Sequence, residues 1–129
     1  MRAYFMCRSL LYITVLFVLC LLGLSNTAIA RETLTGAEPP ANGLWLDTLD
    51  LSAVRQDIKE ARAGKSVRGF EISLGGEVFE HGIGTAASSA FMVDLKGAAA
   101  RFLAVAGIDD ATKGRGSASF SVWVDGVRK

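Results

Sequence analysis

His81 is the residue of this chain best suited to acid–base chemistry, and it is the only histidine among 129 residues. A hydrolytic triad pairs histidine with a serine held at a sharp turn, and no serine lies in the G-x-S-x-G pattern typical of that turn. We therefore interpret His81 first as a polar residue that leads into Gly82-Ile83-Gly84. That glycine-rich segment lacks the third glycine and the following helix of a phosphate-binding loop.

Asp109-Asp110 is the most prominent acidic pair in the sequence. Glycosidases need two carboxylates that face each other across a sugar, but neighbouring residues of an extended chain point to opposite faces. Carboxylates in a loop can also bind Ca²⁺. We prefer the simpler interpretation, a turn in which an aspartate accepts hydrogen bonds from nearby backbone N–H groups. With one histidine and no nearby cysteine, a transition-metal site is not expected.

The two tryptophans, Trp45 and Trp123, are candidates for sugar contact, because the apolar C–H face of a pyranose ring packs on an aromatic plane. Trp123 alternates along the chain with Phe120 and Val122. Its side chain is therefore expected on the outer face of a sheet or under a covering loop. For Trp45 we expect a packing role in the core or at a sheet edge.

Residues 1–30 have the parts of a secretory signal peptide. Arg2 and Arg8 precede an apolar run of 15 residues from Leu10 to Leu24, and Ala28-Ile29-Ala30 resembles a cleavage site. The run is short for a membrane span, which needs about 20 residues. We expect cleavage after Ala30 and a secreted or periplasmic product that makes no membrane contact afterwards.

The predicted mature part contains neither cysteine, because Cys7 and Cys20 lie in the leader, so it can form no disulfide of its own. Without the two leader arginines, 12 basic residues face 13 acidic ones, a net charge of −1. Scattered charges of this kind give no electrostatic footprint for nucleic acid. Residues 31–43, with Pro39-Pro40, are expected to form a linker, and residues 44–129 the folded module.

From Phe70 onward, apolar and polar residues alternate as they do in strands with one buried face. Strands are expected at residues 70–74, 78–79, 91–95, 101–108 and 118–124. Gly75-Gly76 between two apolar runs predicts a hairpin with a type I′ turn. Residues 101–108 are apolar on both faces, which is typical of a central strand. Asp125-Gly126 predicts another tight turn.

Upstream of Phe70 the pattern is mixed. Residues 44–48 alternate and predict a first strand. Residues 51–63 predict one short helix, because apolar residues recur at helical spacing, Asp50 or Ser52 can cap it, and Gly64 can end it. Several short strands separated by glycine-rich turns predict an all-β sandwich or barrel rather than an α/β fold.

A specific series of motifs runs through the chain from Leu44 to Lys129. Its longer blocks are WLDTLDL at 45–51, LGGEVFEHGIGT at 74–85 and GSASFSVWVDG at 116–126, and shorter blocks lie at 65–67, 94–97, 101–102 and 107–110. This ordered series resembles the NPCBM/NEW2 family. Members of that family are carbohydrate-binding modules found beside the catalytic domains of secreted glycoside hydrolases such as α-galactosidase-like enzymes.

The resemblance implies a galactose-binding-like β-sandwich of jelly-roll type that is not an enzyme. It also implies a galactose-containing glycan as ligand and, in longer relatives, a glycoside hydrolase catalytic domain as partner. No cofactor is implied, although some related folds hold a structural Ca²⁺. We expect Trp123, His81 and Arg101 to contact the carbohydrate, although Arg101 suits a salt bridge on its strand as well.

The chain departs from the family pattern at three places. Ala86 stands where the family shows a histidine after Gly-Ile-Gly-Thr, Asp57-Ile58-Lys59 stands where relatives often carry Gly-Trp-Gly, and the family continues with further strands after Asp125-Gly126. We therefore expect a module that is incomplete at its C-terminus and folds poorly after leader removal. The missing histidine favours an alternative function, a structural or interaction sandwich without sugar binding. A stand-alone hydrolase has the least support.

Overall fold

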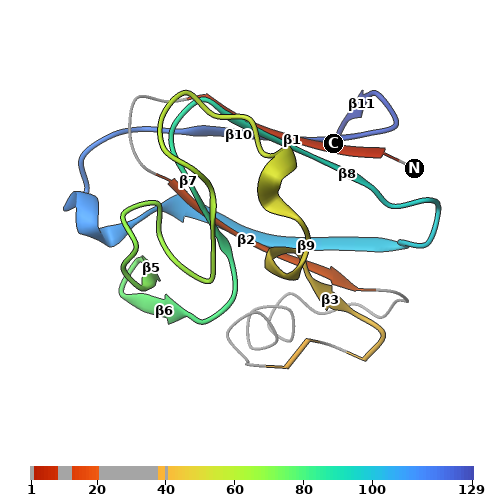
Figure 1. Ribbon diagram of the computed structural model, residues 1–129, viewed down its shortest axis with the longest axis horizontal. Helices are drawn as coiled ribbons and strands as arrows, with labels where there is room; N and C mark the ends of the chain where they lie inside the picture. Colours follow the sequence, from red (N-terminus) through yellow and green to blue (C-terminus); the bar gives the residue numbers. More distant parts are fainter. Residues whose placement is uncertain (1, 9–12, 21–37, 40) are drawn as a thin grey trace.

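The computed structural model describes residues 2–8, 13–20, 38–39 and 41–129, which Figure 1 shows as a strand-rich fold. Its strands are β1 (Arg2–Arg8), β2 (Ile13–Cys20), β3 (Leu44–Trp45), β4 (Arg62–Ala63), β5 (Ile72–Leu74), β6 (Glu77–Phe79), β7 (Ile83–Thr85), β8 (Ser89–Asp94), β9 (Arg101–Ile108), β10 (Ser119–Val124) and β11 (Val127–Arg128). The helical elements of this part of the chain are three short 3-10 turns, η1 (Leu46–Thr48), η2 (Leu51–Ala53) and η3 (Asp110–Thr112). The predicted all-β class is confirmed.

The strands form two larger sheets and one hairpin, and all pairs are antiparallel. The first sheet has the order β11-β10-β1-β8. The second has the order β3-β2-β7-β4, and β9 pairs with the other edge of β2. In Figure 1 the first sheet runs along the upper part of the view and the second lies below it. The jelly-roll connectivity stays a prediction.

Apolar side chains from both sheets meet in one cluster, which we call the inner cluster. Its buried members are Leu46, Ile83, Phe91 and Ala99. Phe102 of β9 and Phe120 of β10 pack against these residues, so the cluster joins the second sheet to the first. Burial of this apolar surface is the main force that holds the two sheets together.

A second group of apolar residues, the outer cluster, covers the other side of β9. Its buried members are Trp45, Ile72, Leu74 and Phe79. Leu103 and Val105 pack against the outer cluster, whereas Phe102 packs against the inner one. Because successive residues of a strand point to opposite faces, β9 has apolar surroundings on both sides.

The hairpin predicted around Gly75-Gly76 is confirmed as β5–β6. Both glycines have positive φ, 63° and 84°, which a type I′ turn requires. Asp110 fixes this turn, because its carboxylate accepts hydrogen bonds from the Ser73 hydroxyl at 2.6 Å and from the N–H groups of Gly75 and Gly76 at 2.9 and 2.8 Å. The hairpin is thereby attached to the loop that follows β9.

The helix predicted for residues 51–63 is wrong. η2 ends after one turn, because Val54 returns to extended backbone with φ −71° and ψ 120°. Arg55 then exchanges two backbone hydrogen bonds with Ala90 of β8, at 2.9 and 2.8 Å. Long-range pairing with a sheet edge therefore overrides a weak local helix preference. Asp50 does cap the turn as predicted, accepting the Ser52 N–H at 2.9 Å.

Two strand predictions also need correction. The first strand is only two residues long, because Thr48 donates its hydroxyl to the Trp45 carbonyl at 2.6 Å and closes η1. β9, predicted to be central, pairs with β2 alone among the described strands. Its two apolar faces reflect the two clusters rather than a central position. β8 and β10 lie where predicted, and Asp125-Gly126 turns the chain into β11.

The segment predicted to be a signal peptide contributes β1 and β2 to the sheets. β1 lies between β10 and β8, and β2 lies between β9 on one edge and β7 and β3 on the other. The predicted cleavage site at Ala30 and most of the predicted linker lie outside the described residues. Within the described ranges, no helix is long and apolar enough to cross a bilayer.

Gly84, the second glycine of Gly82-Ile83-Gly84, has a packing role on β7. A Cβ atom at this position would collide with the Lys65 carbonyl oxygen and with backbone atoms of Ser66 and Val67. The collision involves backbone on both sides, so no side-chain rotation can relieve it. Only glycine allows the 65–67 segment to pass this close to the sheet.

Gly84→Ala should therefore destabilise the full chain by about 3 kcal/mol or more, whereas Gly107→Ala should cost less than about 1.5 kcal/mol. Gly107 is the matched control, because the nearest described atoms that its Cβ would meet belong to the flexible side chain of Leu74, at 3.3 Å. Urea unfolding followed by tryptophan fluorescence measures both values. Equal stabilities for the two variants would contradict the close approach at Gly84.

Asp110 should make stability depend on pH. The hydrogen bonds from Ser73, then from Gly76 and Gly75, hold the pKa of Asp110 below its usual value. A lowered pKa in the folded state adds stability above the unfolded value of about 3.9, and this stability is lost as the pH falls through the folded pKa. Asp110→Asn should lower the melting temperature at pH 7 but much less near pH 2. Asp57→Asn, on an exposed turn, is the control. An equal loss of melting temperature for Asp110→Asn at both pH values would contradict the role of Asp110.

Candidate functional site

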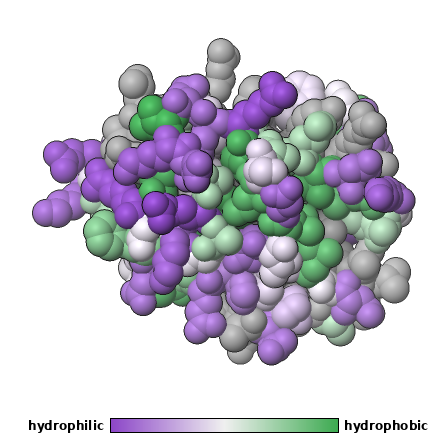
Figure 2. All heavy atoms as spheres, viewed as in Figure 1, coloured by the Kyte–Doolittle hydropathy of each residue, from purple (hydrophilic) through white to green (hydrophobic). Residues whose placement is uncertain are grey.

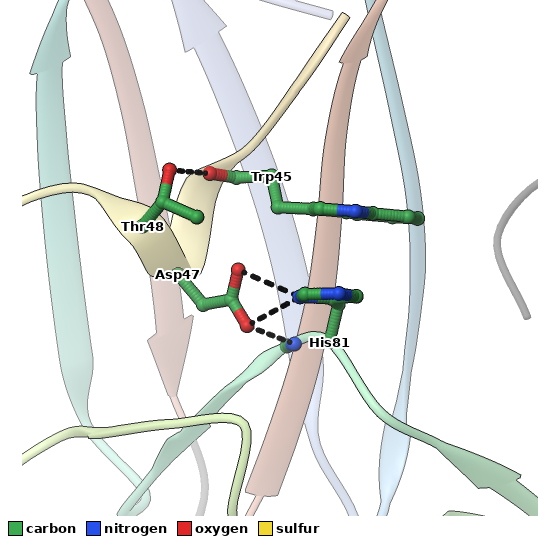
Figure 3. Close-up of polar contacts among 5 residues, drawn as sticks. Trp45, Asp47, Thr48 and His81 are labelled. Atoms are coloured by element: carbon green, nitrogen blue, oxygen red, sulfur yellow. Dashed lines mark hydrogen bonds and ion pairs between the residues drawn. The ribbon is translucent and has the colours of Figure 1, made fainter. Parts of the chain in front are cut away.

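Trp45, Asp47 and His81 come together from two distant segments, as Figure 3 shows. The His81 Nδ1 atom lies 3.2 Å from Asp47 Oδ2, and the imidazole stacks on the Trp45 indole with ring centres 4.5 Å apart and planes 6° apart. Asp47 Oδ2 also accepts the Gly82 N–H at 3.0 Å. We call these three residues the histidine clamp. The clamp ties η1 to the loop between β6 and β7.

The 3-10 turn η1 explains how the clamp is positioned. Trp45 is the residue before this turn and Asp47 lies inside it, so both side chains come from one rigid bend. Consecutive residues are buried on opposite sides here, with Trp45 in the outer cluster and Leu46 in the inner cluster. Trp45 and Asp47 are two residues apart, so an extended segment would also place them on one face.

The clamp offers an oriented imidazole. A carboxylate only accepts hydrogen bonds, so the proton of this contact belongs to His81 Nδ1, as in the aspartate–histidine pair of a hydrolytic triad. The nearby Thr48 hydroxyl donates to the Trp45 carbonyl instead of facing the imidazole (Figure 3). The Asp47 side chain is 6% exposed and the His81 side chain 26%. The clamp therefore suits structural positioning or a hydrogen bond to a ligand rather than nucleophilic chemistry.

Trp45 has the packing role expected for it. It is buried in the outer cluster, and His81 covers one face of its ring, so the indole presents no open plane to a sugar. Among the described residues, its buried Nε1 atom has no hydrogen-bond partner. A buried unsatisfied donor of this kind costs about 1–3 kcal/mol, which the apolar contacts of the ring must offset.

Trp123 and Arg101 lie away from the clamp residues along the chain and are both half-buried. Trp123 points away from the inner cluster, as predicted, and its indole N–H donates to Ser121 Oγ at 3.3 Å. Arg101 shares a face of β9 with Leu103, which packs on the outer cluster. The three predicted carbohydrate contacts therefore lie on two different faces of the fold. His81 and Arg101 belong to the outer side of the second sheet, and Trp123 belongs to the outer side of the first.

A cavity of about 710 Å³ lies beside η2 and the loop that follows it. Its lining residues are Asp50, Leu51, Ser52, Val54, Arg55, Gln56, Lys59, Glu60 and Ala61. Small-molecule sites typically occupy about 300–1,000 Å³. Carboxylate, guanidinium, ammonium and amide groups stand here beside apolar side chains. In size and polarity, the cavity suits a small polar ligand.

Hydrogen bonds hold one wall of the cavity in place. Gln56 donates its Nε2 to the Lys59 carbonyl at 2.8 Å and accepts the Ala86 N–H on Oε1 at 3.1 Å. Ala86 itself is fully buried. The position where the family shows a histidine is therefore enclosed and tied to the cavity wall. At the other end, hydrogen bonds from the Ser52 N–H and hydroxyl lower the pKa of Asp50.

Sequence reasoning missed this cavity. It assigned residues 51–63 to a helix, whose charged residues would lie on a solvated face. The charge-rich stretch 57–60 was a visible signal. This stretch lines a cavity because the Arg55–Ala90 bridge bends the segment along the edge of β8. No local pattern in the sequence specifies a pairing between residues that far apart.

The acidic pair forms turns, in agreement with the preferred interpretation. Asp109 Oδ1 accepts the Ala111 N–H at 2.9 Å and caps η3. Both oxygens of Asp110 are occupied by donors of the hairpin. In the part of the chain that the structure describes, no three or more His, Cys, Asp and Glu side chains gather to hold a metal ion. Calcium binding stays a prediction from the resemblance.

Asp47→Ala should destabilise the chain by about 2 kcal/mol, because it removes the acceptor of the Gly82 N–H and of His81 Nδ1 together. Asp57→Ala, at an exposed turn, is the matched control and should change stability by less than about 0.5 kcal/mol. Thermal unfolding of the full chain at pH 7 compares the two. A loss no greater than that of the control would show that the clamp does not join η1 to the β6–β7 loop.

Comparison with models of known protein families gives a match over most of the chain. The NPCBM/NEW2 domain profile matches residues 42–129, which is more than half of the chain. The matched range contains the histidine clamp and the cavity and begins after β1 and β2. A search of curated proteins and a search of solved structures give no match. The chain therefore belongs to the NPCBM/NEW2 family of carbohydrate-binding modules.

Proposed function

We propose that this chain is a non-catalytic module of a secreted glycoside hydrolase and that it binds galactose-containing glycans in the cavity beside η2. Family membership supports glycan binding in general. The cavity supports this location for the binding site, because its volume is that of a small-molecule site and polar groups line it. The galactose preference, the hydrolase partner and export by the leader rest on the resemblance and on the leader pattern.

Arg55 and Glu60 are the groups we assign to the sugar hydroxyls. Both line the cavity and both are exposed. A guanidinium offers parallel N–H donors and a carboxylate offers two acceptor oxygens, so each can hold two neighbouring hydroxyls. The adjacent 3- and 4-hydroxyls of galactose fit such two-pronged groups. Leu51 and Val54 supply apolar contact for the C–H face of the ring.

Trp123, His81 and Arg101 stay predicted contacts within this proposal. His81 belongs to the clamp, so its replacement would change stability together with any binding. Trp123 is the more informative position, because its side chain points away from the inner cluster. A site on the outer side of β10 would then compete with the cavity as the place where the glycan binds.

Titration calorimetry of the full chain with methyl β-galactoside tests the assignment, with methyl β-glucoside as the comparison sugar. Arg55→Ala and Glu60→Gln should each weaken galactoside binding at least about tenfold, since hydrogen bonds to charged groups contribute about 1.5–3 kcal/mol. Arg115→Ala and Glu71→Gln are matched exposed controls and should leave the affinity unchanged. Loss of binding on Trp123→Ala with both cavity variants unaffected would move the site to β10.

A second function is favoured by Ala86, whose buried methyl group replaces the histidine of the family pattern. In this alternative the module is an interaction domain that holds a neighbouring domain and binds no sugar. A glycan array probed with the full chain separates the two functions. Absence of signal for every glycan, together with tight docking to a glycoside hydrolase catalytic domain, would favour the interaction domain.

A further inference from the structure

We propose that β1 and β2 act as strand donors, and that the rest of the module forms two strand-acceptor slots that these two strands fill. The first slot lies between β8 and β10 and takes β1. The second lies between β9 on one side and β7 with β3 on the other, and takes β2. The family match begins only at residue 42, and the leader prediction assigns these residues no place in the fold.

The first slot uses both edges of β1. Residues 3–8 pair in register with β10, and residues 2–7 pair in register with β8. Without β1, these two strands would each lose their six-residue partner. β10 would keep only a two-residue pairing with β11, and β8 only the bridge between Ala90 and Arg55.

The second slot depends on β2 in the same way. All eight residues of β9 pair with β2. On its other edge, β2 pairs with three residues of β7 and two of β3. Without β2, β9 would have no partner among the described strands, and β7 would keep only its two-residue pairing with β4. Pairings this short are marginal in water, so the second sheet would not persist.

The composition of the donor fits the slots. Both faces of β9 are covered by apolar clusters, so a strand beside it needs apolar residues without alternation. β2 reads ITVLFVLC and has no charged residue. The first slot has apolar residues of the inner cluster on one side and exposed Met92 on the other, and β1 reads RAYFMCR, with charges only at its ends. Aromatic residues in β1, and β-branched and aromatic residues in β2, favour extended backbone.

The same residues thus have two uses that exclude each other. An apolar run held by export machinery as a leader cannot at the same time pair with β9. A chain that folds before export would bury its leader, and a chain cleaved after Ala30 would expose two open slots. Open slots present unpaired N–H and C=O groups, which attract other strands. In a cleaved chain, we expect both slots to bind a peptide of residues 2–20 added from outside.

Disulfide trapping in the full chain tests the first slot with a native cysteine. Cys7 lies opposite Ser89 in the register. Opposite residues have Cα atoms about 4.5–5.5 Å apart, within reach of a disulfide. In a Cys20→Ser background under mild oxidation, Ser89→Cys should trap nearly all of the chain as an internal disulfide. Met92→Cys, three residues further along β8, is the control and should trap almost none.

The second slot has its own matched pair. Cys20 lies opposite Arg101, and Ala104 is three residues further along β9. In a Cys7→Ser background, Arg101→Cys should form the internal disulfide and Ala104→Cys should not. Mass spectrometry after alkylation counts the remaining free thiols. Free thiols in both matched variants, or equal trapping in matched and control variants, would overturn the proposal.

A complementation experiment tests the donor role directly. A protease recognition sequence inserted after Ala30 in the full chain allows the donor to be cut after folding. The cut complex should keep its β-sheet circular dichroism and its cooperative melting. Refolding after removal of the donor should abolish cooperative melting, and a synthetic peptide of residues 2–20 should restore it. Cooperative melting of the separated remainder at an unchanged temperature, or no recovery with the peptide, would overturn the donor role.

Discussion

Backbone pairing with β1 and β2 is the constraint on which both sheets depend. The long strands β8, β9 and β10 each make their main ladder with β1 or β2. A strand that stays unpaired leaves N–H and C=O groups without partners, and burial of such groups is costly. The inner cluster forms from side chains of all three long strands, so its packing requires the same pairing.

The same strand pairing also positions the histidine clamp and the cavity. The histidine clamp starts from β3 and closes on the loop before β7, and both strands pair with β2. The cavity is bent into place by the Arg55–Ala90 bridge on β8, which pairs with β1. Both features thus lie on the part of the chain that defines the NPCBM/NEW2 family, but their geometry depends on strands outside it.

The hydrophilic surface in Figure 2 is interrupted by apolar residues toward the middle of the view, as expected for a small fold with a thin core.

Local patterns predicted the features that local physics determines. The hairpin needed only two glycines that tolerate positive φ between apolar runs, and strands β8 and β10 needed only a period of two. The segment 51–63 defeated prediction because its helical spacing competes with a pairing to Ala90, more than thirty residues away. The leader could not be interpreted from sequence for a similar reason, since an apolar run suits an export signal and a strand beside β9 equally well. Only part of the clamp was predictable, because the sequence shows a histidine at position 81 but not its contact with Asp47.

Residue-resolved amide hydrogen exchange of the full chain tests the central claim most directly. A strand paired on both edges has every N–H in a ladder, whereas an edge strand has only alternate ones. Residues 3–7 of β1 pair on both sides, so their consecutive amides should all be protected, and β9 should show protection at alternate residues. Exchange of residues 3–7 at the rate of an unfolded chain, with β8 and β10 still protected, would contradict the account.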